Sequence, residues 1–137
     1  MKILVDSNVA IDVLLERDTF YTSALKVFGL SKGSCEIFVS ASTITDIYYI
    51  VSSLKKSKEI AMASIKNLLA MVDVAAVTSN EIRQAVNLDW GDFEDAVQYA
   101  AGESIAVDYL VTRNKKDFAS ATLPVVSPDE LLALLVA

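Results

Sequence analysis

The segment Lys2-Ile3-Leu4-Val5-Asp6-Ser7-Asn8 decides how the rest of the chain is interpreted. Its short apolar run, Ile3-Leu4-Val5, is typical of a buried strand, and the polar residues after it start a helix. In an open parallel sheet, ligands bind beyond the carboxyl ends of the strands, and Asp6 is expected at such an end. Asp6 or Asn8 can equally be an ordinary helix cap. This segment alone leaves the two interpretations about even.

Strand and helix patterns alternate along the chain, which we expect to form a single domain over residues 1–137. Apolar runs predict strands at 2–5, 36–40, 73–77, 108–112 and near 124–126. The pattern between them predicts helices at about 8–16, 20–30, 43–54, 58–71, 79–87 and 92–103. Ser127-Pro128-Asp129-Glu130 then opens a last helix, with a serine cap and a glutamate three residues later. Such alternation predicts an α/β fold with a parallel sheet covered by helices on both faces.

The composition limits the class of protein. A hydrophobic fraction of 53% fits a sheet covered on both faces or an oligomer with an apolar interface, and we expect a homodimer. No apolar stretch approaches the roughly 20 residues of a membrane-spanning helix, and the N-terminus shows no signal-peptide pattern. The one cysteine, Cys35, excludes an internal disulfide and fits a reducing compartment. These features predict a cytoplasmic protein without a membrane partner.

Four aspartates, each placed where a strand gives way to a helix, carry most of the information about function. They are Asp6, Asp46, Asp95 and Asp117, with Asp92 beside the third. The chain has no histidine, which excludes catalysis and zinc binding by imidazole. A carboxylate site favours hard divalent cations, which prefer oxygen ligands. The net charge of −6 argues against passive coating of nucleic acid. Nucleic acid stays open as a substrate, because a cation-loaded carboxylate cluster changes sign locally.

Helix capping is the alternative explanation for these acids. Thr43 and Asp46 have the spacing of a capping box, as do Asp92 and Asp95. For Asp46 alone, capping is the favoured interpretation. For the helix that starts near Asp92, the four acids within 89–95 exceed what one cap requires and repel one another without a cation. Its apolar stripe is predicted at Phe93, Ala96, Val97, Ala100 and Ala101.

The segment Val111-Thr112-Arg113-Asn114-Lys115-Lys116-Asp117-Phe118 follows the fourth predicted strand. Its oxygen-bearing side chains, on Thr112, Asn114 and Asp117, can ligate a cation or position water. Its basic residues are candidate phosphate contacts: Arg113, Lys115 and Lys116. The alternative is a polar turn with a helix cap at Asn114, and Phe118 is expected to anchor the core.

Together these residues resemble a PIN domain over nearly the whole chain. The resemblance rests on Ile3 to Val9, on Asp92-Phe93-Glu94-Asp95-Ala96-Val97-Gln98, and on Val111 to Phe118, the most specific of the three. It implies a three-layer α/β/α PIN-like domain with a central parallel sheet of about four to five strands. It also implies an Mg²⁺- or Mn²⁺-dependent ribonuclease that hydrolyses RNA phosphodiester bonds.

The resemblance also assigns roles to individual residues. Asp6 matches the first family acid and Asp95 the third, while Asp46 falls at the second, where many members carry glutamate. These three would hold the metal. The fourth position falls at Asn114, where other members have aspartate, and Asp117 lies close enough in sequence to replace it. Supporting roles are implied for Ser7 and Asn8 beside the first acid, and for Asp92, Thr112 and Asn114.

The chain is further similar to the toxin half of VapBC-type toxin–antitoxin pairs, which implies a cognate antitoxin bound in the active-site groove and a toxin dimer. A PIN-fold module that binds protein or RNA partners without cutting RNA is the main alternative. A haloacid-dehalogenase-like phosphatase is disfavoured, because Asn8 stands where such enzymes carry a second aspartate. A receiver domain is disfavoured by the Asp6-Ser7-Asn8 start, which lacks the expected acidic pair.

Overall fold

The computed structural model describes residues 1–136, the last of them by its backbone alone. Its five-stranded sheet is parallel at every strand pair and has the order β3-β2-β1-β4-β5. The strands are β1 (Lys2–Val5), β2 (Glu36–Ser40), β3 (Asp73–Ala75), β4 (Tyr109–Val111) and β5 (Val125–Val126). All five strands were predicted from the sequence. β3 and β4 are shorter than expected, by two residues each.

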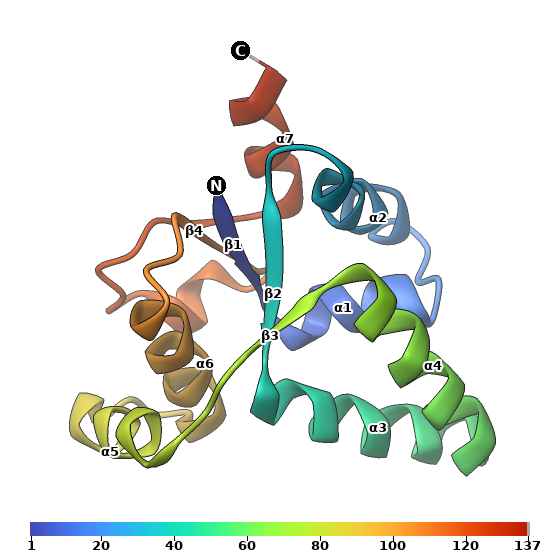
Figure 1. Cartoon of the computed structure of the whole chain (residues 1–137), viewed down its shortest axis with the longest axis horizontal. Helices are drawn as coiled ribbons and strands as arrows, with labels where there is room; N and C mark the ends of the chain where they lie inside the picture. The colour runs from blue at the N-terminus through green and yellow to red at the C-terminus, as the bar shows by residue number, and fades with distance from the viewer. Residues whose placement is uncertain (137) are drawn as a thin grey trace.

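Helices cover both faces of the sheet. They are α1 (Ser7–Leu14), α2 (Tyr21–Gly29), α3 (Ala41–Lys55), α4 (Lys58–Met71), α5 (Ser79–Leu88), α6 (Phe93–Ser104) and α7 (Pro128–Val136), with 3₁₀ helices η1 (Leu30–Lys32) and η2 (Lys115–Phe118). Figure 1 shows α1 to α4 on one side of the sheet and α5 and α6 on the other. The predicted three-layer α/β/α architecture is therefore confirmed.

Alternation along β1 explains why two cores form. Ile3 and Val5 pack with α1 to α4 and α7 in one cluster, while Leu4 packs with α6 and η2 in another. Leu4 lies opposite Phe38 of β2 and Leu110 of β4, so the second core continues across the sheet. All three β1 residues are fully buried, as expected for a strand with helices on both sides.

Gly102 sets how closely α6 packs on β1. A Cβ atom at this position would meet Leu4 Cδ2 at 3.0 Å and Val107 Cγ2 at 3.3 Å. Only glycine fits without displacing these buried side chains. The last turn of α6 therefore lies directly against Leu4 of β1.

Several helix starts differ from the sequence prediction. Ser40 caps α3 by accepting a hydrogen bond from Thr43 N (3.3 Å), so the predicted capping box of Thr43 and Asp46 is wrong. Asp46 lies in the second turn of α3, beyond the reach of a capping role. The side chain of Asn114 makes no capping hydrogen bond at the start of η2, which contradicts the cap that the polar-turn alternative placed there. Phe93 was expected in the apolar stripe of α6, but it is 49% exposed.

Other local predictions hold. Ser127 and Glu130 form reciprocal hydrogen bonds at the start of α7 (2.9 and 3.1 Å). Phe118 is buried in the core on the α6 side of the sheet. Among the described residues, no helix is long and apolar enough to cross a membrane.

Candidate active site

Asp6 is the most firmly held acid at the carboxyl edge of the sheet. It directly follows β1, caps α1, and donates its backbone N–H to Val111 O on β4 (2.9 Å). Its Oδ1 accepts hydrogen bonds from Ser7 N (2.7 Å) and Ser7 Oγ (3.3 Å). Its Oδ2 accepts one from Thr112 Oγ1 (2.7 Å). Asp6 is therefore a helix cap whose buried carboxylate is also fixed at the strand end.

Hydrogen bonds through Thr112 connect the predicted supporting residues Asn8 and Asn114 to the Asp6 carboxylate. The Thr112 side chain is fully buried, and its hydroxyl accepts hydrogen bonds from Asn114 N (3.1 Å) and Asn8 Nδ2 (3.5 Å) while donating to Asp6. Asn8 Oδ1 is buried and has no hydrogen-bond partner within the described residues. Buried acceptors are normally satisfied, so this oxygen is available to a group that the chain itself does not supply.

Asp95 lies at the centre of the acid cluster. Asp92 caps α6 by accepting Asp95 N (3.0 Å), which places the Asp95 side chain in the first turn of the helix. Burial, followed by the charges of Asp92, Asp6, Asp117 and Glu94, raises the pKa of Asp95 from 3.8 to about 7. Segments far apart in the sequence thus place carboxylates within electrostatic reach of one group.

Asp46 lies on α3, and its charge acts on Glu94 of the cluster. The charge of Asp46 is the largest cause that raises the pKa of Glu94, ahead of burial and of Asp92. The pKa of Asp46 itself is raised by burial. The sequence motifs predicted no individual role for Glu94. The only available signal was its membership of the acid-dense stretch 89–95, which does not distinguish it from its neighbours.

Every charge that acts on the pKa of Asp95 is negative. The structure therefore places the predicted acids Asp6, Asp92 and Asp117 within electrostatic reach of Asp95, and Asp46 within reach of Glu94. In the described part of the chain, no basic side chain acts on the pKa of Asp95. Carboxylates this close destabilise one another's charged forms unless a cation intervenes. The cluster is short of positive charge.

The donor chemistry fits a hard divalent cation, because all the clustered groups are oxygen donors and the orphan Asn8 Oδ1 adds another. As the side chains stand in the described part of the chain, no three acidic or thiol groups are close enough together to hold one ion.

Two of the three candidate phosphate contacts are engaged within the protein. Arg113 donates from Nε to Asp12 Oδ2 (2.6 Å) and from Nη2 to Asp12 Oδ1 (3.2 Å). Lys115 forms an ion pair with Glu130 (2.9 Å). Lys116 is exposed and lines a cavity of about 320 Å³ together with Asp92 and Asp117. Lys116 thus shares this cavity with two of the predicted acids.

Asp12 is a buried acid that the sequence analysis missed. It lies on α1 with 1% of its surface exposed, 101 positions away from Arg113, its hydrogen-bonding partner. An acid between the apolar residues Ile11 and Val13 is the one signal in the sequence, and that signal names no partner. The pair fixes Arg113 directly after Thr112 and so supports the turn that holds Asp6.

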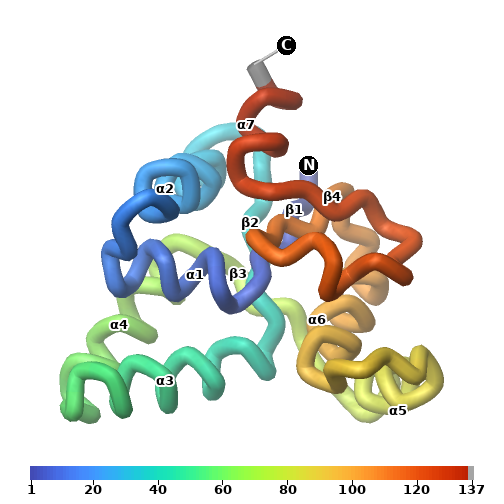
Figure 2. Tube along the Cα trace, turned by 180° about the vertical axis from the view of Figure 1, so that it is seen from behind, coloured from blue at the N-terminus to red at the C-terminus, as the bar shows by residue number. Residues whose placement is uncertain are grey.

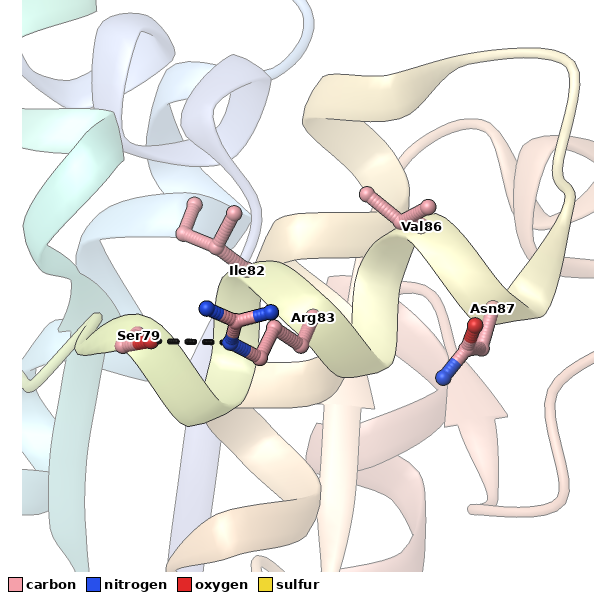
Figure 3. Close-up of a pocket in the computed structure, with 5 residues that line it drawn as sticks. All are labelled: Ser79, Ile82, Arg83, Val86 and Asn87. Carbon is pink, nitrogen blue, oxygen red and sulfur yellow. Dashed lines mark hydrogen bonds between the residues drawn. The ribbon is translucent and has the colours of Figure 1, made fainter.

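A surface hollow on α5 is not part of this site. It has a volume of about 500 Å³ and is lined by α5 residues alone: Ser79, Ile82, Arg83, Val86 and Asn87 (Figure 3). Arg83 Nε donates to Ser79 Oγ within the same helix (3.1 Å). No carboxylate of the cluster borders this hollow, so its size carries no information about catalysis.

The chain is similar in sequence or in structure to several known proteins. The ribonuclease VapC1 of Aquifex aeolicus (strain VF5) is 27% identical over 137 residues, covering 94% of this chain and 92% of that protein. The VapBC2 structure from Rickettsia felis, bound to a promoter DNA fragment, contains a chain that superposes with a TM-score of 0.71 at 18% identity, covering 93% and 98%. Mycobacterium tuberculosis VapC20, a toxin that cleaves the sarcin–ricin loop, gives 0.71 at 16% identity, covering 86% and 94%. A family model described as the PIN domain matches residues 2–116. The chain belongs to the PIN domain family.

Proposed function

We propose that this chain is a metal-dependent ribonuclease that hydrolyses RNA phosphodiester bonds. The observation that carries the proposal is that four other carboxylates, and no basic group, act on the charge of Asp95. Membership of the PIN domain family and likeness to a protein named ribonuclease VapC1 support it. The position of the cluster beyond the carboxyl ends of β1 and β2 is where ligands bind in parallel sheets.

In this proposal Asp6, Asp46 and Asp95 hold Mg²⁺ or Mn²⁺, and Asp117 acts as the fourth catalytic acid in place of Asn114. The bound metal would lower the pKa of a water and stabilise charge that develops on the phosphate. Ser7 and Thr112 hold the two Asp6 oxygens in fixed directions through hydrogen bonds of 2.7 Å each. Such preorganisation avoids reorientation of the carboxylate during the reaction.

Asp95 and Asp92 have different roles in this proposal. Asp92 accepts the backbone N–H of Asp95 and so fixes the first turn of α6. With its pKa near 7, Asp95 holds a proton part of the time at neutral pH when no cation is bound. Asp95 is therefore the acid whose charge depends most on what occupies the cluster.

We further propose that the chain is the toxin of a toxin–antitoxin pair and works in the cytoplasm as a homodimer with a cognate antitoxin. The VapBC character of the similar structures supports this. An inactive module that binds protein or RNA partners is the competing function. The aspartate at the second acid position and Asn114 at the fourth favour it, since both depart from the pattern of the catalytic family acids.

The test is cleavage of a mixed RNA substrate with Mg²⁺, with Mn²⁺ and with EDTA. We expect cation-dependent cleavage that Asp95→Asn reduces by at least about 10³-fold, the scale on which loss of electrostatic stabilisation acts. Asp89→Asn is the matched control. Asp89 belongs to the same acid-rich stretch, does not act on the pKa of Asp95, and has φ 54°, a conformation that asparagine tolerates. Equal cleavage by the Asp95→Asn and Asp89→Asn proteins would contradict the assignment.

A further inference from the structure

A second cavity, of about 390 Å³, lies between the start of α2, the start of α7 and the turn after β4. α2 and α7 lie side by side in both views (Figures 1 and 2). Ser23 Oγ on α2 donates a hydrogen bond to Asp129 Oδ1 on α7 across this junction. The side chains that line the cavity include Phe20, Ser23, Arg113, Asn114 and Asp129. The ribonuclease chemistry proposed above leaves the cavity without a role.

An aromatic ring and a guanidinium group form one wall of the cavity. Arg113 Cζ lies 4.0 Å from the centroid of the Phe20 ring, and two hydrogen bonds to Asp12 hold the guanidinium in place. Phe20 is nevertheless 41% exposed, so its ring still offers surface to an incoming group. Positioned aromatic and arginine surfaces of this kind bind single-stranded nucleic acid by stacking on its bases.

The charges around the cavity favour a base over a phosphate group. Asp12 already neutralises Arg113, and Asp129 places a carboxylate at the rim, which repels phosphate oxygens. Ser23 donates one hydrogen bond to Asp129 Oδ1, and because each carboxylate oxygen has two acceptor sites, both oxygens can still accept a donor from a ligand. A carboxylate is an acceptor only, so the preferred ligand presents N–H groups.

Among the four RNA bases, guanine matches this requirement best. Its Watson–Crick edge carries two adjacent donors, N1–H and N2–H, which a carboxylate can accept together. Uracil presents one N–H between two carbonyl oxygens, which Asp129 would repel. Adenine and cytosine each place a ring acceptor beside their amino group, so each offers the carboxylate one donor on that edge.

Asn114 connects the cavity to the acid cluster. It lines the cavity, and its backbone N–H donates to Thr112 Oγ1 (3.1 Å), the hydroxyl that also holds Asp6 (2.7 Å). We propose, building on the ribonuclease function above, that this cavity binds a guanine base of the RNA close to the cleaved phosphodiester. Phe20 stacks on the base, and Asp129 accepts its N1–H and N2–H.

The first experiment measures binding of guanosine and of uridine by the shifts of backbone amide NMR signals in EDTA. Nucleosides carry no phosphodiester, so this readout does not depend on cleavage. We expect guanosine to shift the amides of residues 19–23 and of 129, and uridine to bind about tenfold more weakly. Phe20→Leu is expected to weaken guanosine binding about tenfold. Asp129→Asn is expected to remove the preference for guanosine while keeping an acceptor for Ser23.

Phe93→Leu is the matched control, since Phe93 is an exposed phenylalanine that does not line the cavity. Failure of guanosine to shift these amides, or equal guanosine affinity in the Phe20→Leu and Phe93→Leu proteins, would overturn the inference. Guanosine binding without any RNA cleavage would support the base site and remove the ribonuclease proposal. RNA cleavage without guanosine binding would support the ribonuclease proposal and overturn the base site.

Discussion

Asp12 and Asp95 are both shielded carboxylates near the carboxyl edge of the sheet, yet their surroundings are opposite. Asp12 receives two hydrogen bonds from Arg113 and has Arg17 at 3.8 Å. Asp95 faces other carboxylates, and burial together with their charges raises its pKa to about 7. The chain supplies a counter-charge where an acid holds the fold together. At Asp95, where the acting charges are all negative, we propose that a bound cation supplies the counter-charge.

Breaking the Asp12 pair should give the largest effect on stability. Arg113→Met leaves Asp12 buried without its main partner, and we expect the free energy of unfolding to fall by about 3–5 kcal/mol. Chemical denaturation checks this. The double variant Asp12→Asn with Arg113→Met should recover much of the loss, because no buried charge is then left alone. A double variant no more stable than Arg113→Met would show that Asp12 does not need the counter-charge.

Removing the Asp95 charge should raise the free energy of unfolding, in contrast to the loss expected when the Asp12 pair is broken. Its folded pKa of about 7 lies above the ordinary value of 3.8, so the folded state binds more protons between these values. Stability therefore falls as pH rises from about 4 to 7. In EDTA, the stability gained by Asp95→Asn over the unmodified chain should be larger at pH 7.5 than at pH 4.5. Denaturation at both pH values measures it, and a gain that does not change with pH would refute the raised pKa.

A smaller effect is expected from Glu94→Gln. Glu94 is the last of the charges that raise the pKa of Asp95, and its own pKa is raised mainly by Asp46. The substitution should lower the pKa of Asp95 by only a fraction of the total shift and leave the fold intact. Carboxyl NMR titration of Asp95 and Asp46 would show this. An unchanged titration of both groups would mean that Glu94 lies outside the cluster.

The sequence predicted which acids would lie near one another, but it did not predict which acids would have a basic partner. Asp6 could be placed because parallel strands end at one edge and hydrophobic alternation locates those strands. Asp95 follows helix α5 and not a strand, so only the motif of the family resemblance placed it beside Asp6. The pairing of Asp12 with Arg113 joins residues 101 positions apart, and no local pattern reports such a contact. Taken alone, Asp46 was interpreted as a cap because its spacing from Thr43 allowed it, whereas Ser40 at the end of β2 provides the cap. The exposure of Phe93 depends on how α6 docks, which its periodicity does not specify.

We propose that the acid cluster lacks a positive charge and binds a hard divalent cation to gain one. Calorimetric titration with Mn²⁺ near pH 6.5 tests it directly on the intact chain, on Asp95→Asn and on Asp89→Asn. We predict binding accompanied by proton release in the intact chain, at least tenfold weaker binding in Asp95→Asn, and no change in Asp89→Asn. Mn²⁺ binding of equal strength in all three proteins, or none in the intact chain, would contradict the claim.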